Sequence, residues 1–195
     1  YFMLGLPTET DEDILGIAEL CNKIAALYYD TVPKEKRGGS RVQIVASTSF
    51  FVPKPFTPFQ WVPQCTKEDF LEKAYQTRTA VSEQLNQKSI KYNWHEADAS
   101  VMEGVFARGD RRLCRVIRKV YEKGGFYDAW GEYYDNDKWM ETLEECGLSA
   151  EFNTHRQRPL DEILPWDFID CGVSKAFLQR EWEKAGREEN SENCK

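Results

Sequence analysis

The residues best placed to do chemistry stand at the junction of an apolar run and an amphipathic run. Tyr1-Phe2-Met3-Leu4 has the pattern of a strand, and Gly5-Leu6-Pro7-Thr8-Glu9-Thr10 follows it directly. A glycine at such a junction lets the backbone approach a ligand, and the free amides of the next helix can accept an anion or a polar group. A structural turn before a capped helix would have the same sequence. The pattern therefore leaves a binding loop and a structural turn as open interpretations.

A second unusual segment spans residues 50–63. Its four prolines exclude a helix, and its four phenylalanines and one tryptophan supply large side chains that need to be buried. We expect an ordered lid or wall at this place. Its aromatic side chains either seal the end of a barrel or sheet, or close an apolar ligand site at the carboxyl ends of parallel strands, where α/β folds place their sites.

Arginines gather between residues 108 and 118. A spacing of three and four predicts that four of them share one helix face, namely Arg108, Arg111, Arg115 and Arg118. Such a face is either paired with the carboxylates of this acidic chain or in contact with phosphate, because guanidinium groups bind phosphates in bidentate fashion.

Histidine and cysteine give weaker signals. His95 and His155 lie far apart in the sequence, and we expect neither to bind a metal. The six cysteines show no short spacing, so free and mostly buried thiols are expected. Cys194, in the polar tail from Glu188 to Lys195, is a candidate first ligand of a cluster or metal site completed beyond Lys195.

Composition narrows the class of protein. The chain has 195 residues, of which 41% are hydrophobic and 30% charged, as in folded domains. Its net charge of −7 argues against the broad positive surface of a nonspecific nucleic-acid binder. No apolar run approaches the roughly 18 residues of a membrane span and no secretory signal opens the chain, so we expect a soluble cytoplasmic protein without membrane contact. Because the chain opens inside an apolar run, we also expect a fragment of a longer protein.

Periodicity predicts the elements that position these residues. Strands are expected at 1–4, 41–47 and 89–95, separated by helices from 11 to about 29 and from 66 to about 87. Thr10 and Asp13 have nearly the spacing of a capping box. Strands joined by a helix favour parallel pairing with a right-handed crossover. Beyond Asp98 short helices are expected, at 99–107, from Asp110 to before Gly124, at 136–146 with Asn136 as cap, and from Ser174 to about 184.

The two loops together resemble a known family. Gly-Leu-Pro-x-Glu-Thr after one strand and Val52-Pro53-Lys54-Pro55-Phe56-Thr57-Pro58 after the next resemble the fifth and sixth strands of radical S-adenosylmethionine (radical SAM) enzymes, with Phe56 in place of a glycine. The chain is most similar to a sparsely characterised radical SAM clade that often carries a cobalamin-binding-like domain. This resemblance rests on residues 49–61, 107–112 and 165–170 and so covers nearly the whole chain.

The resemblance implies a fold and an activity. The fold would be α/β: the C-terminal part of a radical SAM partial (β/α) barrel over 1–95, a mainly α-helical extension over 96–187, and a polar tail or linker over 188–195. The activity would be reductive cleavage of S-adenosylmethionine to a 5′-deoxyadenosyl radical by a [4Fe-4S] cluster bound to CxxxCxxC. That motif is absent here. The cluster ligands are therefore expected in the upstream half of the barrel, with this fragment inactive alone, and cobalamin is a further implied cofactor.

The resemblance also implies which residues line the cofactor. Met3, Leu4 and Gly5 would lie on the adenine side, and Phe51-Val52-Pro53 beside adenine or substrate. Met3 and Leu4 fit a barrel core equally well. Glu9 is foremost a helix-start carboxylate, although its position allows contact with a cofactor.

Two other classes of function stay open. A non-catalytic module would bind RNA or a protein through the face from Arg108 to Arg118, with Arg108, Arg111 and Arg115 as weaker candidates for substrate or phosphate contacts. A degenerate barrel kept for assembly is the third reading. The sequence indicates neither the substrate, the type of reaction nor the oligomeric state.

Overall fold

A computed structural model describes residues 1–191 and divides them into two compact units. Unit 1 consists of Tyr1–Phe51 and Cys65–Ala97, and unit 2 of Val52–Gln64 with the described residues from Asp98 onward. Over the described part of the chain, no helix is both long and apolar enough to span a membrane.

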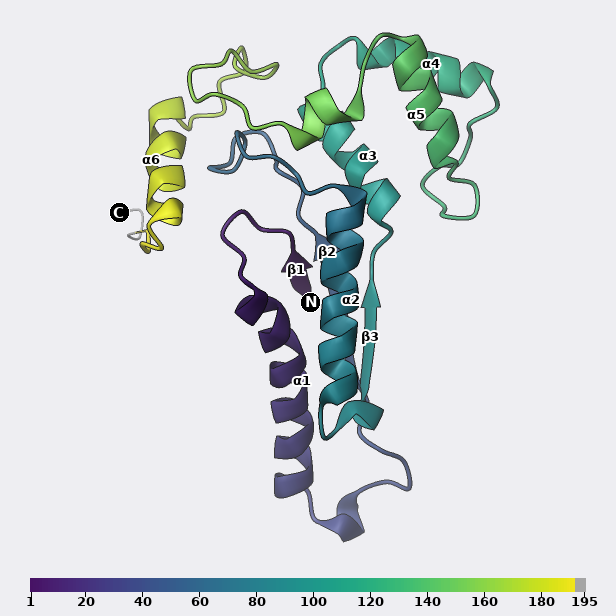
Figure 1. The fold of residues 1–195 in the computed structure, drawn as a ribbon, viewed down its shortest axis with the longest axis vertical. Coiled ribbons are helices and arrows are strands. Elements are labelled where there is room, and N and C mark those ends of the chain that lie inside the picture. Colours follow the sequence, from purple (N-terminus) through teal and green to yellow (C-terminus); the bar gives the residue numbers. More distant parts are fainter. Residues whose placement is uncertain (192–195) are drawn as a thin grey trace. The chain divides into compact units, whose positions relative to one another are not determined.

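Unit 1 is a small parallel β/α structure (Figure 1). Its strands are β1 (Phe2–Leu4), β2 (Ile44–Phe50) and β3 (Ile90–Trp94), joined by α1 (Asp11–Thr31) and α2 (Lys67–Glu83). The strands pair in parallel in the order β1-β2-β3. The predicted parallel pairing and the mixed α/β class are confirmed, but β2 begins and ends three residues later than the strand predicted at 41–47.

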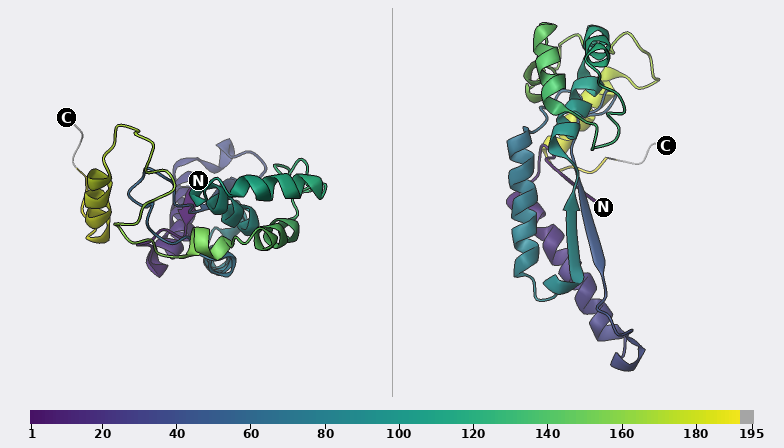
Figure 2. Two further views of the ribbon diagram at one scale, coloured as in Figure 1. Left: turned by 90° about the horizontal axis from the view of Figure 1, so that it is seen from above. Right: turned by 90° about the vertical axis from the view of Figure 1, so that its right-hand side faces the viewer.

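Both crossover helices cover the same face of this sheet. Helices α1 and α2 pack against each other as well as against the strands. In the right-hand view of Figure 2, α2 runs along one side of the strands. Leu4, Ala46, Thr48 and Phe50 point toward the helices and are buried. Among residues 1–191 the three strands form an open sheet.

Helices α1 and α2 both begin with a capping box. Thr10 accepts a hydrogen bond from the Asp13 N–H while the Asp13 carboxylate accepts one from the Thr10 N–H, and Thr66 and Asp69 repeat the arrangement. Each capping box satisfies backbone donors that a helix start leaves free. The predicted starts of both helices are confirmed. The second ends earlier than predicted, at Glu83, because the chain turns into a short 3₁₀ segment over Gln87–Ser89.

Unit 2 is mainly helical. Its elements are α3 (Ala97–Arg108), α4 (Leu113–Glu122), α5 (Asn136–Glu145), a π-helical turn (Glu151–His155) and α6 (Lys175–Gly186). One core packs α3, α4 and α5 together through Val105, Val116, Val120, Trp139 and Leu143. Residues 52–64, here named the proline-rich loop, are joined to the C-terminal segment by a second core of Trp61, Leu164, Trp166 and Leu178.

In unit 2 the sequence predicted some helix starts correctly and others not. Ser174 caps α6 as predicted, since its side chain accepts a hydrogen bond from the Phe177 N–H. Helix α5 is capped by Asp135 and not by Asn136, because the Asp135 carboxylate accepts from the Lys138 N–H. Asp110, the predicted cap of α4, accepts a hydrogen bond of 2.8 Å from the Arg112 N–H, as a capping carboxylate does, but the regular helix begins only at Leu113.

The prediction that four arginines share one helix face is wrong. Arg108 is the last residue of α3 and is fully buried, Arg111 lies in the turn before α4, and only Arg115 and Arg118 stand on α4. The pattern of three and four was read across a break, because the chain leaves the helix at Gly109. A Cβ at Gly109 would lie 2.7 Å from the Val105 carbonyl oxygen, which cannot move aside as a side chain can, so the tight turn requires glycine.

The cysteine prediction is partly wrong. All five described cysteines are free, as expected, but Cys21 alone among them is buried. Cys114 and Cys171 are exposed. Cys194 lies outside the described residues.

Candidate functional site

The loop from β1 to α1 is closed by its own glutamate. The Gly5 N–H donates a hydrogen bond of 2.8 Å to Glu9 Oε2, and the Lys73 ammonium on α2 lies 2.8 Å from Glu9 Oε1. The Glu9 side chain is only 4% exposed. Both carboxylate oxygens are therefore engaged inside the protein, and Glu9 holds the loop against α2.

Charge around this loop is balanced. Partial burial opposes the charged form of Lys73, but the hydrogen bond and negative charge of Glu9 outweigh it, so the pKa of Lys73 is raised. The Cys65 thiol points at the Gly5 carbonyl oxygen, 3.8 Å away. Burial raises the pKa of Cys65, which keeps the thiol protonated.

Gly5 has a packing reason to be glycine. Its φ of +89° lies in the left-handed region, and a Cβ there would stand 2.7 Å from the Phe70 ring. Phe70 in turn stacks on Phe50, with ring centroids 4.4 Å apart. Leu4 is buried beside them, at 1% exposure. Of the two interpretations of this loop, the structural turn accounts for Gly5, Glu9 and Leu4 without a ligand.

The predicted second segment is split between the units. Phe51 belongs to unit 1, where its N–H donates 2.8 Å to the Leu4 carbonyl oxygen and extends the pairing of β1 with β2. Val52 and Pro53 belong to unit 2 and are buried. Phe51 is also buried.

The open face of the sheet carries a different set of residues. In the strand register, Met3 pairs with Ser49, Ser47 with Asn93, and Val45 with Lys91, and these six residues alternate with those that face the helices. Met3 is 46% and Val45 56% exposed. Parallel sheets are normally covered on both faces. This face therefore offers hydroxyl, amide and ammonium groups on a surface that lacks a layer over it within unit 1.

Ser47, Ser49 and Asn93 are residues that sequence reasoning missed. The signal was present in β2, where small polar residues at 47 and 49 alternate with Ala46, Thr48 and Phe50. Only the strand register placed Asn93 beside Ser47. Of the predicted cofactor residues, Met3 is the one whose side chain shares their face.

A hollow of about 310 Å³ lies along the free edge of β1. Its walls come from β1, the following loop and the first turns of α1, and include Phe2, Met3, Thr8 and Ile17. Because Leu4 uses its carbonyl toward β2, strand geometry turns the peptide groups of Met3 outward, toward this hollow. Either a further strand paired with β1 or a small ligand could occupy this hollow.

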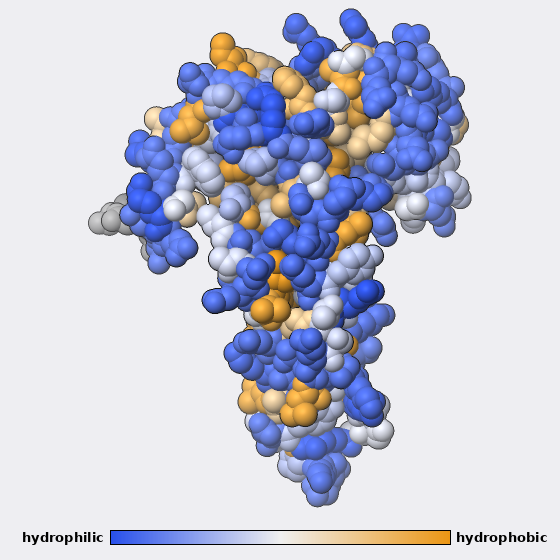
Figure 3. Space-filling view, in the orientation of Figure 1, coloured by the Kyte–Doolittle hydropathy of each residue, from blue (hydrophilic) through white to orange (hydrophobic). Residues whose placement is uncertain are grey.

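Helix α1 shows an apolar stripe in addition to its buried face. Leu20, Ile24 and Leu27 are 46%, 47% and 61% exposed and lie a helical turn apart. The buried residues of α1, such as Ala18 and Ala25, lie on another side of the helix. Apolar side chains gather over the lower half of α1 in the space-filling view (Figure 3).

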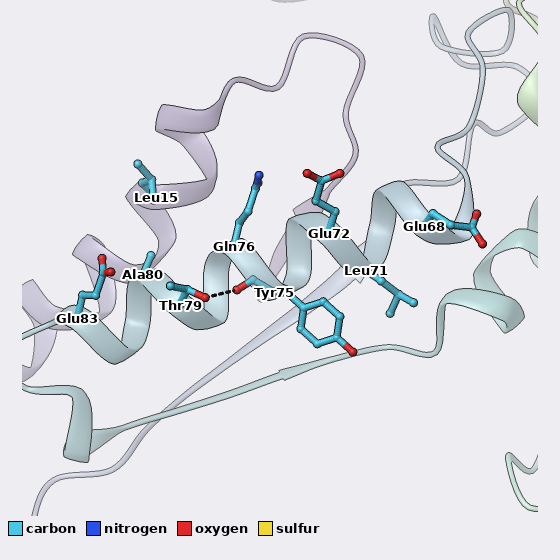
Figure 4. A pocket seen from close by; sticks show the side chains of 9 residues that line it. All are labelled: Leu15, Glu68, Leu71, Glu72, Tyr75, Gln76, Thr79, Ala80 and Glu83. Atoms are coloured by element: carbon cyan, nitrogen blue, oxygen red, sulfur yellow. Dashed lines mark hydrogen bonds between the residues drawn. The ribbon is translucent and has the colours of Figure 1, made fainter.

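A larger hollow, of about 740 Å³, follows the outer side of α2. Its side chains do not converge: Gln76 and Glu72 point to one side of the helix, and Leu71 and Tyr75 to the other (Figure 4). This is an open helix surface. Within residues 1–191, moreover, no three His, Cys, Asp or Glu side chains are grouped so as to hold a metal ion.

In unit 2 the predicted arginines separate into two environments. Arg108 donates to the carbonyl oxygens of Val62 and Thr154, and Arg158 donates to those of Arg108 and Asn153. Arg111 and Arg115, in contrast, are exposed and make no ion pair with the described residues.

Buried arginine therefore anchors the proline-rich loop. The Arg158 N–H donates 2.9 Å to the Trp61 carbonyl oxygen, and the Gln64 N–H 2.8 Å to that of Thr154. Burial and the charges of Arg158 and Arg156 lower the pKa of Arg108 to about 10. Arg108 is a structural residue of unit 2, and only Arg111 and Arg115 remain available for contacts.

Comparison with known proteins gives one distant relative. No family model matches the chain, and no solved structure matches it. An uncharacterized protein of Methanocaldococcus jannaschii is 30% identical over 148 residues, which are 76% of this chain and 29% of the relative. The chain thus spans less than a third of the length of the curated relative it matches.

Proposed function

We propose that this chain is the C-terminal portion of a radical SAM enzyme, in which unit 1 contributes the last strands of a partial (β/α) barrel. The observation that carries the proposal is the winding of unit 1. Its three parallel strands follow one another in chain order, with both crossover helices on one face. A (β/α) barrel winds one way and keeps its inner face free of helices, as unit 1 does. One βαβαβ half of a doubly wound sheet has the same winding, so the proposal rests on this winding together with the resemblance of the two loops.

The unpartnered surfaces of unit 1 support this proposal. The free edge of β1 and the stripe Leu20, Ile24 and Leu27 on α1 belong to the first βα unit. One preceding βα unit would pair its strand with β1 and pack its helix on that stripe. The matched relative is long enough to supply such units, since this chain spans only 29% of it.

On this structure, fewer of the residues implied by the resemblance remain candidates for direct contact with the cofactor. S-adenosylmethionine carries hydroxyl and amino groups, for which Ser47, Ser49 and Asn93 offer partners, and Met3 adds an apolar contact on the same face. Leu4, Gly5 and Glu9 would support that face from behind. The described residues hold no metal-ligand group, so the proposal takes the [4Fe-4S] ligands from elsewhere in the polypeptide.

The experiment uses the full-length polypeptide. Its gene is expected to encode CxxxCxxC upstream of Tyr1, and the protein reconstituted with iron and sulfide is expected to bind S-adenosylmethionine and release 5′-deoxyadenosine. Ser47→Val with Asn93→Leu is expected to weaken S-adenosylmethionine binding about tenfold in equilibrium dialysis, because two hydrogen bonds are lost. Ser82→Ala, on exposed helix surface, is the matched control.

Two results would overturn the proposal. One is a start codon directly before Tyr1, or an upstream barrel without the three cysteines. The other is equal S-adenosylmethionine binding by the double variant and the Ser82→Ala control, which would remove the open face from the site even if the cluster forms.

A second function is favoured by a separate observation. Arg111 and Arg115 are exposed and make no ion pair with the described residues, although the Asp110 carboxylate at the start of α4 partly offsets the charge of Arg111. A phosphate group of RNA would be attracted to both. Charge reversal at both residues should then abolish RNA binding in a filter assay while leaving S-adenosylmethionine cleavage intact; unchanged binding would exclude this surface.

A further inference from the structure

The loop between α4 and α5 displays large aromatic side chains to solvent. Residues 123–135 are here named the aromatic loop. Its exposed rings are Phe126 (49% exposed), Tyr127 (74%), Trp130 (64%) and Tyr133 (56%), and Tyr121 (64%) lies just before it. Single exposed apolar residues are ordinary on protein surfaces, but a group of rings in one short loop marks an interaction site. Tyrosine and tryptophan are also the residues that dominate binding energy at interfaces.

Hydrogen bonds give this loop a defined shape. Trp139 Nε1 donates 3.1 Å to the Asp128 carboxylate, and the Tyr134 hydroxyl donates 3.1 Å to the Asn136 side chain. Two successive turns then space the exposed rings, since the Trp130 N–H donates to the Tyr127 carbonyl and the Tyr133 N–H to that of Trp130. The rings of Tyr127 and Tyr133 end 6.0 Å apart. The aromatic display is therefore built into the fold.

Tyr127 holds an unfavourable backbone conformation. Its φ is +62°, a region that bulky side chains rarely adopt. A glycine would fit that conformation better, and glycines stand nearby at 124 and 125. Local strain of this kind concentrates at functional sites, where a particular side chain is needed.

The charge around the rings is negative on balance. Four carboxylates lie in or beside the aromatic loop, at Asp128, Glu132, Asp135 and Asp137. The two lysines there are paired, Lys123 with Glu145 and Lys138 with Asp135, whereas Glu132 and Asp137 make no ion pair with the described residues. Burial and the carboxylates of Asp98, Asp128 and Asp135 raise the pKa of Tyr134, as expected for negative potential at its hydroxyl. A cationic group is attracted both by these carboxylates and by the faces of aromatic rings.

We propose that the aromatic loop docks a lysine- or arginine-rich segment of a protein partner, with a cationic side chain held at Tyr127, Trp130 and Tyr133 and neighbouring basic groups facing Glu132 and Asp137. A single-stranded nucleic acid would also stack on the rings, but its phosphates would meet the carboxylates. A second copy of this chain carries a net charge of −7 and is disfavoured for the same reason.

Peptide binding to the full chain tests the proposal. Fluorescence anisotropy would compare a labelled octa-arginine peptide, a labelled octaglutamate peptide and a labelled oligouridylate. The arginine peptide is expected to bind, and more weakly as salt rises. Tyr127→Gly is expected to weaken it about tenfold while the protein stays folded, because glycine suits the backbone at this position.

Matched variants separate docking from general attraction to an acidic protein. Phe168→Ser removes a ring that is 86% exposed elsewhere in unit 2, and Asp161→Asn removes an exposed charge there. Neither is expected to change binding, whereas Glu132→Gln is expected to reduce it. Equal affinity for Tyr127→Gly and Phe168→Ser would overturn the proposal. So would binding of oligouridylate in place of the arginine peptide, or concentration-dependent self-association lost in Tyr127→Gly.

Discussion

The two units handle buried charge differently. In unit 1 one carboxylate, Glu9, meets one ammonium, Lys73, and its other oxygen holds the Gly5 N–H. In unit 2 the guanidinium groups of Arg108, Arg156 and Arg158 gather near a single carboxylate, Glu162.

The bonds of Glu162 show how unit 2 supports this imbalance. Glu162 binds Arg156 through two hydrogen bonds, of 2.7 and 2.6 Å, and lies 3.8 Å from Arg158. Arg108 relies on backbone carbonyl oxygens instead. In unit 1 a balanced ion pair therefore holds the loop between β1 and α1. In unit 2 buried guanidinium groups that donate to backbone carbonyl oxygens hold the proline-rich loop. Substitutions that remove one charge at a time should have different consequences in the two units.

The largest expected effect is that of Arg108→Ala. It removes a fully buried side chain and leaves the Val62 carbonyl oxygen without its donor, so the free energy of unfolding should fall by about 3–5 kcal/mol. Arg108→Met fills the space and removes an uncompensated charge, and should cost less. Urea unfolding measures both. A loss for Arg108→Ala no larger than that for the exposed control Arg115→Ala would contradict the anchoring role.

Gly5→Ala should follow in size. The added methyl meets the Phe70 ring and the backbone keeps φ at +89°, so about 2–4 kcal/mol of stability should be lost. Gly124→Ala is the matched control, because its φ is +82° but nothing lies within 4 Å of the added atom. It should cost only the backbone strain, about 1 kcal/mol. Equal losses in thermal unfolding would show that packing against Phe70 contributes nothing.

Glu9→Gln should have a smaller effect, of about 1–2 kcal/mol, since Lys73 is partly exposed. The raised pKa of Lys73 sets the pH dependence. Its contribution is fully present below the ordinary value of 10.5 and is lost as pH rises through the higher folded-state pKa. At alkaline pH, the stability difference between wild type and variant should therefore shrink above about pH 10.5. A constant difference up to strongly alkaline pH would refute the pairing.

Glu162→Gln should have the smallest effect and the opposite pH dependence. The hydrogen bond from Arg156 lowers the pKa of Glu162 below its ordinary 4.5. The stability it contributes is present above pH 4.5 and is lost as pH falls through the lower folded-state value. Acid titration monitored by circular dichroism should show wild type and variant converging below pH 4.5. Convergence at neutral pH would mean that unit 2 gains nothing from this carboxylate.

Much of unit 1 could be predicted from the sequence. The capping residues of α1 and the parallel pairing of its strands followed from signals a few residues long, such as Thr10 with Asp13. The start of α4 and the cap of α5 did not. At α5 two neighbouring residues, Asp135 and Asn136, can both act as a cap, and the Asp135 carboxylate is the one that accepts from the Lys138 N–H.

The candidate site was predicted only in part. The sequence pointed to Met3 at the strand end and to the loop with Gly5 and Glu9. In the structure Met3 lies on the open face of the sheet, whereas Gly5 and Glu9 pack against α2. Ser47 and Asn93 come from strands more than 40 residues apart in sequence, and only the register of β2 with β3 makes them neighbours.

The sequence by itself determined where α1, α2 and α6 begin, because their capping residues act over a few residues. Tertiary structure decided which polar groups are free. Arg108 and Arg115 have the same side chain, yet one is buried against Val62 and Thr154 and the other is exposed. Glu9 and Glu132 differ in the same way. Burial and hydrogen bonding depend on residues that are distant in the chain, and these two quantities decide whether a charged side chain stabilises the fold or remains available to a ligand.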